Sequence, residues 1–231
     1  MKTGVLTTML DILLPRLCTA CRSPLKPWEE GLCLTCLAQL PLTHFHEDAE
    51  NPLAQVFWGR VQLEQAVAWF YFRKGSAYQD VLHQLKYEGR SDIGVLLGRE
   101  FGFHLIHSQQ FTLPDTIIPV PLHPKKLRQR GYNQSAEIGR GLGRAIGVPM
   151  IQNCLVRLSH TDTQTRKSRF ERYLNVSGKF QVQHPGMLQG HHLFLVDDVV
   201  TTGATLEACA EALLTIPEVK VSIGALCWAK D

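Results

Sequence analysis

The sequence has no long hydrophobic run, no internal repeat and no low-complexity tract. None of its apolar runs approaches the roughly 20 residues that a membrane-spanning helix needs, so no membrane span is expected. The short apolar stretch from Val5 to Leu14 follows Lys2 as in a signal peptide, but Asp11 interrupts it and no small-residue cleavage site follows before Pro15. Its apolar residues recur at helical spacing. We therefore predict an amphipathic packing helix and a cytoplasmic protein.

Charge is not abundant either. Charged residues make up 19% of the chain and hydrophobic residues 45%, which is ordinary for a soluble globular protein. The 231 residues suffice for one α/β domain plus a small module. The net charge of +3 is unevenly spread, because residues 123–179 hold twelve Lys and Arg against three Asp and Glu. This stretch is either a solvated basic face or a surface for the phosphates of a nucleotide or nucleic acid.

The seven cysteines do not form the disulfide framework of a secreted protein. Four of them form two Cys-x2-Cys pairs separated by eleven residues, a spacing typical of a structural zinc site: Cys18, Cys21, Cys33 and Cys36. A redox Cys-x-x-Cys would usually be single and beside a βαβ pattern. Four thiolates leave no open coordination position, so we expect structural Zn²⁺ in an N-terminal ribbon. The nearby His44 and His46 are interpreted as surface residues. The remaining cysteines are predicted to be small core residues: Cys154, Cys209 and Cys227.

Beyond residue 50 the pattern alternates between strands and helices. We predict a helix and zinc-ribbon module over residues 1–50 and an α/β domain over residues 51–231. Strands are predicted at residues 66–72, 116–120, 154–158, 192–196 and 219–228, and helices at 77–87, 92–107, 133–145 and 205–214. This alternation favours a mostly parallel sheet flanked by helices.

The strongest motif is the segment LFLVDDVVTTGAT, residues 193–205. Its four apolar residues predict a buried strand, and ligands of open α/β sheets bind at the carboxyl end, where Asp197 and Asp198 lie. The loop and the helix N-terminus that follow offer N–H groups to an anion, and Gly203 lets the backbone approach it. Threonine hydroxyls add donors, whereas the carboxylates suit ribose hydroxyls. The alternative is a polar strand end with a capped turn. We predict a site for ribose 5-phosphate, with these contacts: Asp197, Asp198, Val199, Val200, Thr201, Thr202, Gly203, Ala204 and Thr205.

Two basic segments add cations. Residues 121–134 contain Lys125, Lys126, Arg128 and Arg130 and no acid, between a predicted strand and a predicted helix. Cations held there would stabilise a diphosphate leaving group, unless the segment is only an exposed basic helix start. Residues 163–175 are also basic, and an exposed charged helix is the alternative there.

The segment 193–205 resembles the motif for 5-phosphoribosyl 1-diphosphate (PRPP) of type I phosphoribosyltransferases. More closely, the chain from about Leu14 to Trp228 is similar to the ComF family, also called GntX, the competence protein F group of bacteria. Four features carry this resemblance: the paired cysteines, Gln84–Tyr87, Pro119–Leu122 with Arg130–Gln134, and the PRPP motif.

The resemblance implies a type I phosphoribosyltransferase-like fold and binding of PRPP together with Mg²⁺. It implies catalytic roles for Asp197, Asp198 and Arg130. It also implies that Arg128, Arg130 and Gly131 bind the pyrophosphate group. Arg169 and Arg172 would belong to a mobile loop that adds further contacts to this group. Arg166 and Lys167 stand where the family pattern leads us to expect glycine and leucine, so we expect the conformation of that loop to differ from that of the family. Lys86 recurs in the family motif, without an assigned chemical role.

Two functions remain open at this point. The first is an enzyme that transfers ribosyl phosphate from PRPP to an acceptor that the sequence does not identify. The second is a non-catalytic protein that uses the PRPP site as a sensor, or binds single-stranded DNA through the ribbon and the basic face. The ComF resemblance implies a role in DNA uptake and natural transformation, with DNA-uptake proteins as partners.

Overall fold

A four-stranded parallel sheet forms the centre of the molecule. The computed structural model describes residues 15–158 and 180–229. The strands of this sheet lie in the order β1, β6, β5, β2, and every neighbouring pair runs parallel. Their bounds are Ala66–Tyr71 for β1, Thr116–Pro119 for β2, His192–Val200 for β5 and Lys220–Trp228 for β6. A smaller antiparallel pair joins β3 (Leu155–Arg157) to β4 (Phe180–Val182).

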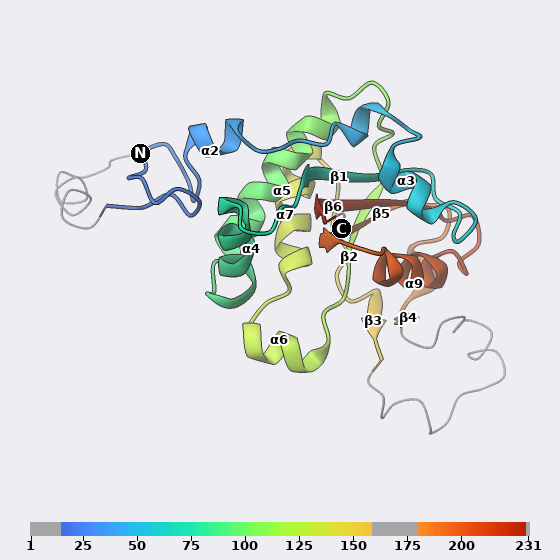
Figure 1. The fold of residues 1–231 in the computed structure, drawn as a ribbon. Helices are drawn as coiled ribbons and strands as arrows, with labels where there is room; N and C mark the ends of the chain where they lie inside the picture. The colour runs from blue at the N-terminus through green and yellow to red at the C-terminus, as the bar shows by residue number, and fades with distance from the viewer. Residues whose placement is uncertain (1–14, 159–179, 230–231) are drawn as a thin grey trace.

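Helices cover both faces of this sheet (Figure 1). The main helices are α4 (Ala77–Tyr87), α5 (Ser91–Ile106), α6 (Pro124–Arg130), α7 (Gln134–Ile146) and α9 (Ala204–Leu213). Helices α5 and α7 pack together on one face, and α9 lies on the other. Short elements complete the described chain: α2 (Leu34–Ala38), η1 (Phe45–Glu47), α3 (Pro52–Phe57) and η2 (Pro185–Met187). The predicted mostly parallel sheet flanked by helices is confirmed.

The middle strands are buried along their length, which explains their sequences. All nine residues of β6 except Lys220 are buried, and so are the first five residues of β5. Parallel strands covered on both faces are near-continuous apolar runs for this reason. A side chain at Gly224 would lie 2.3 Å from the ring of Phe194 on the neighbouring strand, so glycine makes room for that ring.

Close packing of α5 on α7 fixes the helix that leads into the site. A Cβ added at Gly98 would lie 2.1 Å from the carbonyl oxygen of Ile138, and one at Gly141 equally close to that of Val95. Only glycine permits the two backbones to approach this far, since a larger side chain would force them apart. The N-terminus of α7 is thereby held next to the ends of β2 and β5.

The N-terminal segment packs on the same core. The Tyr78 hydroxyl on α4 donates to the carbonyl of Cys36 at 2.8 Å, and Leu32 and Phe45 join the main hydrophobic cluster. The division at residue 50 therefore stays a prediction. The predicted helix within Val5–Leu14 lies outside the described residues. Within the described chain, no helix is both long and apolar enough to cross a membrane.

Candidate functional site

The site is formed where β5 extends beyond the end of its neighbour β2. Strand β2 ends at Pro119, which pairs with Val196, whereas β5 continues to Val200 by pairing with β6. The strand is thus four residues longer than the predicted 192–196, because β6 supplies partners that the local sequence does not reveal. From Asp197 onward, β5 no longer has β2 beside it, so this edge of β5 is unpaired. A pocket lies at this opening.

This pocket, called here the central pocket, has a volume of about 250 Å³ and brings acids and cations together. Its walls come from α4, the end of β2, α6, α7, β3, β5 and α9. The lining residues are Lys86, Tyr87, Val120, Pro121, Leu122, Lys126, Arg130, Gln134, Ser135, Arg157, Asp197, Asp198 and Thr205. Two carboxylates and four cationic side chains therefore share one small cavity.

Asp198 is buried and has its own counter-charge. Its Oδ2 atom lies 2.9 Å from Nζ of Lys86, and its side chain is 8% exposed. The ammonium group does not approach Oδ2 along a well-aligned hydrogen bond, so charge attraction is the main contact. The Val199 N–H donates to Oδ1 at 2.8 Å. Lys86, to which no role was assigned from the sequence, is thus a member of the site.

Asp197 is held by hydrogen bonds instead. Its Oδ1 atom accepts from the Ser135 hydroxyl at 2.8 Å and from the Asp198 N–H at 2.9 Å. Burial and the neighbouring Asp198 charge raise the pKa of Asp197 to about 7, against the hydrogen bond from Ser135. A carboxyl group with this environment is poised to gain further hydrogen-bond donors or a cation, which would favour its charged form.

The Arg130–Gln134 motif connects the other walls of the central pocket. The Tyr132 hydroxyl donates to the backbone of Leu85 on α4, and the Arg130 guanidinium lies 5.1 Å from the ring centre of Tyr87. Asn133 caps α7 and donates to the carbonyl of Val120 at 2.9 Å. The motif therefore joins the end of β2 to the end of α4, and it places Ser135 beside Asp197.

The loop after β5 forms a second, smaller cavity of about 60 Å³ that borders the central pocket. It is lined by Asp197, Val199, Val200, Thr201, Thr202, Gly203, Ala204, Thr205 and Leu206, so Asp197 and Thr205 belong to both cavities. Thr201, Thr202 and Thr205 are exposed, and the first N–H groups of α9 face the same end. The loop has the features of an anion site at a helix N-terminus.

Helix α3 packs against this loop and holds it in place. Gly203 has φ +75°, and a Cβ there would lie 2.8 Å from the ring of Phe57. Arg60 donates to the carbonyl of Thr202 at 3.2 Å and forms an ion pair with Glu207 in the first turn of α9. Because Glu207 would repel an anion at this helix N-terminus, its neutralisation by Arg60 favours anion binding. Neither contact was predicted, since both join segments far apart in the sequence.

The predicted diphosphate residues fall in different places. Residues 124–130 form α6, none of whose residues is buried, so the predicted strand-end loop contains a short helix. Arg130 lines the central pocket, whereas Arg128 is not among the lining residues. Gly131 ends α6 with φ +81°. Arg169 and Arg172 lie outside the described residues.

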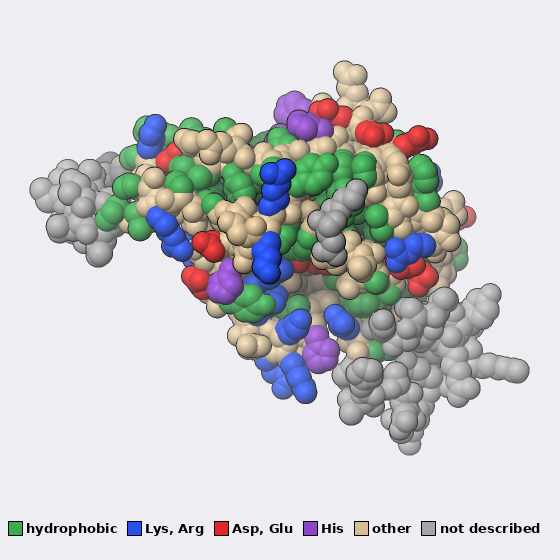
Figure 2. Space-filling view, viewed as in Figure 1, with side chains coloured by type: hydrophobic (Ala, Val, Ile, Leu, Met, Phe, Trp, Pro, Cys, Tyr) green, Lys and Arg blue, Asp and Glu red, His purple; other side chains and the backbone are tan. Residues whose placement is uncertain are grey.

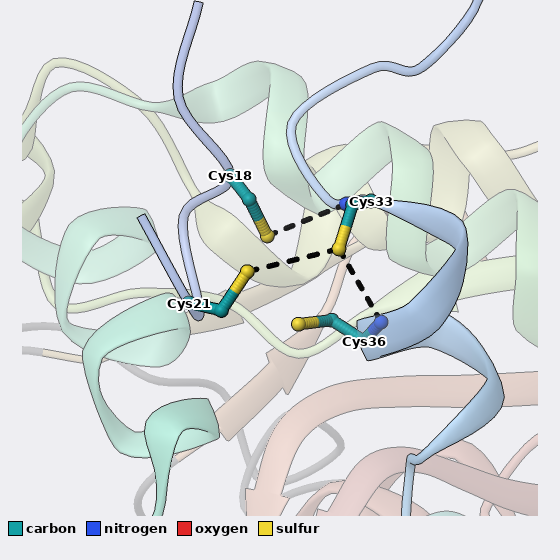
Figure 3. Close-up of side chains that lie close together, drawn as sticks. All are labelled: Cys18, Cys21, Cys33 and Cys36. Atoms are coloured by element: carbon teal, nitrogen blue, oxygen red, sulfur yellow. Dashed lines mark hydrogen bonds between the residues drawn. The ribbon is translucent and has the colours of Figure 1, made fainter. Parts of the chain in front are cut away.

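The four N-terminal cysteines converge as the spacing predicts (Figure 3). Their sulfur atoms all lie within 4.8 Å of one another, and Cys21 Sγ lies 3.7 Å from Cys33 Sγ. Ligands of a tetrahedral zinc ion at about 2.3 Å stand about 3.8 Å apart, so the cluster can hold a metal such as zinc. Hydrogen bonds from Ser23 lower the pKa of Cys21 to about 6, while burial raises the pKa of Cys33 and of Cys36. A divalent cation would favour the thiolate form of all four.

Two further expectations concern single residues. Cys154, Cys209 and Cys227 are buried, as predicted for core cysteines. The interpretation of His46 as a surface residue is wrong, because it is only 5% exposed. It follows the buried Phe45 in η1, which packs on β1, and its ring contacts that of His104 on α5, so its burial depends on tertiary packing.

Comparison with known proteins identifies close relatives over nearly the whole chain. The DNA utilization protein YhgH of Escherichia coli K12 is 31% identical over 232 residues, covering 94% of this chain and 98% of YhgH. Competence protein ComFC of Bacillus subtilis is 26% identical and covers 86% of this chain and 78% of its own length. Competence protein F of Haemophilus influenzae is 35% identical over about half of each chain, 49% and 51%. No family model matches the chain.

Among solved structures, the chain is similar to phosphoribosyltransferases. An adenine phosphoribosyltransferase aligns with a TM-score of 0.40 and 16% identity, covering 65% of this chain and 75% of that one. The glutamine PRPP amidotransferase of B. subtilis aligns with a TM-score of 0.37 and 20% identity, covering 58% and 26%. Both likenesses concern the arrangement of the backbone only.

The cysteine cluster leads to a prediction about zinc content. Replacing Cys18, which is fully buried and accepts a hydrogen bond from the Cys33 N–H at 3.3 Å, by serine should reduce bound zinc from one ion per chain to almost none. The thermal midpoint should fall as well, since zinc binds only the folded cluster. Cys154→Ala is the matched control and should keep its zinc. Elemental analysis and thermal unfolding measure both effects, and zinc retained by Cys18→Ser at the wild-type level would contradict this assignment.

Proposed function

The chain belongs to the ComF family of competence proteins, and from that premise we propose that it binds PRPP with Mg²⁺ at the end of β5 and acts in DNA uptake. The observation that carries the proposal is the continuity of the two cavities through Asp197 and Thr205. One cavity has anion-binding features, and the other joins carboxylates to cations. Phosphate, ribose and diphosphate follow each other in the same order along PRPP.

The 5-phosphate binds at the loop between β5 and α9. Its oxygens accept from the threonine hydroxyls and from the first N–H groups of α9, in line with the favourable electrostatics of a helix N-terminus. Arg60 supports this assignment because it removes the opposing charge of Glu207. The ribose then lies next to Asp197, whose carboxylate accepts from ribose hydroxyls. Those donors favour its charged form, against the burial that raises its pKa to about 7.

The diphosphate binds on the far side of the acids, among Lys126, Arg130 and Arg157. In the transfer reaction, the bond between the anomeric carbon and the diphosphate oxygen breaks and its electron pair leaves with the diphosphate. An acceptor nucleophile forms the new bond at that carbon. Fixed cations stabilise the charge that develops on the leaving group, and the acids and the loop hold the sugar in place.

Mg²⁺ accompanies PRPP in this proposal rather than occupying a site of its own. Among the described residues, the acids at the end of β5 do not belong to a group of three or more ligand atoms close enough together for a metal. Asp198 is paired with Lys86, and Asp197 Oδ1 already accepts two hydrogen bonds. Magnesium commonly binds through substrate phosphates with only one or two protein carboxylates, so such a site forms with the substrate.

Arg130 and Arg128 provide a matched test of the PRPP site. Both belong to α6, but only Arg130 lines the central pocket. Because a charge-assisted hydrogen bond contributes roughly 1.5–3 kcal/mol, Arg130→Gln should raise the Kd for PRPP with Mg²⁺ at least about tenfold. Arg128→Gln should change it by less than about threefold. Isothermal titration calorimetry measures both values. Equal effects of the two variants, or none from Arg130→Gln, would count against this placement of the diphosphate.

A second candidate activity, binding of single-stranded DNA, is favoured by the basic surface of α6. Lys and Arg side chains gather at the lower edge of the molecule (Figure 2), where Figure 1 shows α6. Lys125 and Arg128 are exposed there and lie outside the lining of the central pocket. The relatives named as competence and DNA utilization proteins support a role that involves DNA. Exposed cations on a short helix suit contacts to a phosphate backbone.

The salt dependence of DNA binding tests this second activity. Each lost phosphate contact should flatten the slope of log K against log salt by about 0.7 for single strands, so Lys125→Ala with Arg128→Ala should flatten it by about 1.4. PRPP binding should stay within about threefold of wild type. Lys220→Ala, at the opposite end of the sheet, is the control. Fluorescence anisotropy with an oligonucleotide measures the slopes, and unchanged slopes in the double variant would place DNA elsewhere or exclude direct binding.

A further inference from the structure

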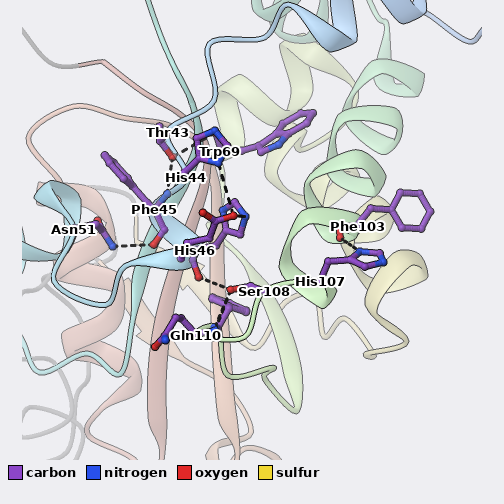
Figure 4. Close-up of polar contacts among 12 residues, drawn as sticks. Thr43, His44, Phe45, His46, Asn51, Trp69, Phe103, His107, Ser108 and Gln110 are labelled. Atoms are coloured by element: carbon purple, nitrogen blue, oxygen red, sulfur yellow. Dashed lines mark hydrogen bonds and ion pairs between the residues drawn. The ribbon is translucent and has the colours of Figure 1, made fainter.

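A cluster of histidines lies on the opposite side of the sheet from α9, away from the sites described above. It surrounds an open pocket of about 400 Å³ that is lined by His46, Glu47, Phe103, His104 and His107. His46 and Glu47 belong to η1, and the other three to the last turn of α5 and the residue that caps it. Figure 4 shows the two segments facing each other. The sequence carries these ligands as His-x-His-Glu and His-x-x-His, about sixty residues apart.

Pairs of side chains in this cluster, rather than the whole group, stand at distances close to those of a metal site. Glu47 Oε1 lies 3.6 Å from His46 Nε2 and 3.8 Å from His44 Nδ1. The ring centres of His46 and His104 are 5.8 Å apart, and those of His44 and His46 are 6.1 Å apart. Two imidazoles that bind one metal at about 2.0–2.1 Å have ring centres about 5–6 Å apart, depending on the angle between them.

The histidine nitrogens are less closely gathered than the four cysteine sulfurs, so binding requires side-chain rotation. This rotation is inexpensive at the rim, because the Glu47 side chain is 62% exposed and that of His44 is 59% exposed. The least mobile member is His46, which stays in place while the exposed residues close around the metal.

The backbone that carries His46 is already fixed. The Ser108 hydroxyl, just beyond α5, donates to the carbonyl of His46 at 2.5 Å. The Asn51 amide donates to the carbonyl of Phe45 at 3.2 Å, and the Phe45 N–H donates to the Thr43 hydroxyl at 3.2 Å. The first of these contacts joins η1 to the residues just beyond α5, and the other two fix η1 within residues 43–51, so the two ligand segments meet before any metal binds.

His46 itself lacks the partners that a buried imidazole needs. Its side chain is 6% exposed, its Nε2 atom lies 3.6 Å from the rim carboxylate of Glu47, and its buried Nδ1 atom has no hydrogen-bond partner. The nitrogen that faces Glu47 is Nε2, so a metal shared with Glu47 would bind at Nε2.

From this arrangement we propose a second metal site, in which His46, Glu47 and His104 bind a divalent transition metal. His44 and His107 complete the coordination at the rim. Imidazole ligands with one carboxylate suit Zn²⁺, Ni²⁺ or Co²⁺ rather than Mg²⁺ or Ca²⁺. The metal joins η1 to α5 and thereby braces the segment between the cysteine cluster and α3.

Titration of Co²⁺ into protein whose cysteine cluster is filled with Zn²⁺ tests the proposal. One further equivalent should bind, with the weak visible bands of nitrogen and oxygen coordination and without the strong thiolate charge-transfer band. Glu47→Gln and His104→Gln should each weaken this binding at least about tenfold. Glu47 is exposed, so loss of folding does not complicate the first variant.

His83→Gln is the matched control, since His83 is an exposed histidine of α4 that pairs with Glu88. It should bind the second equivalent like the wild type. The proposal is overturned if zinc-loaded wild type binds no second equivalent, or if both ligand variants bind it with unchanged affinity. A thiolate band during the titration would mean that Co²⁺ is replacing Zn²⁺ in the cysteine cluster, and the proposal is also overturned if this replacement accounts for all of the bound Co²⁺.

Discussion

Two adjacent carboxylates at the end of a buried strand repel each other, and the elements around β5 compensate for that repulsion. Asp198 takes the counter-charge of Lys86 from α4, and Asp197 takes the hydroxyl of Ser135 from α7. Without these partners the pair would be unfavourable, because partly buried charge needs compensation. The cost that remains is visible in the raised pKa of Asp197. Such an arrangement is better suited to binding than to stability.

The sequence motifs of the chain share one structural role, which is to bring their segments together around this pair of carboxylates. Tyr132 attaches the Arg130–Gln134 motif to α4, the helix that carries Lys86, while Asn133 attaches it to the end of β2. The glycine contacts between α5 and α7 bring the start of α7 to the same place. Helix α4 and the stretch from the end of β2 to the start of α7 therefore converge on the carboxyl end of β5, where open α/β sheets bind their ligands.

Regular elements were predictable because their patterns are local. Helix α4 occupies the predicted residues 77–87, and Asn133 caps α7 as expected. The end of β5 was not predictable, since it depends on pairing with β6. Contacts between side chains that are distant in the sequence were not predictable for the same reason. A lone lysine in a helix, for example, does not indicate that it faces Asp198. The motif that contains Lys86 was the available signal.

The same limit explains why the burial of His46 and the different positions of the α6 arginines were not predicted. Nothing in the sequence near His46 indicates that it is buried between β1 and α5. A basic segment likewise does not reveal which of its side chains points into a pocket, and the structure separates Arg130 from Arg128. The cysteine cluster was predictable because its geometry follows from spacing within two short segments.

The most direct test of the central claim is a calorimetric titration of PRPP with Mg²⁺ into the zinc-loaded protein and into the double variant Asp197→Asn, Asp198→Asn. The account predicts saturable binding by the wild type that the folded variant loses, because the neutral amides lack the charge that strengthens hydrogen bonds from ribose hydroxyls and pairs with Lys86. Absence of binding by the folded wild type, or equal binding by the variant, would contradict it.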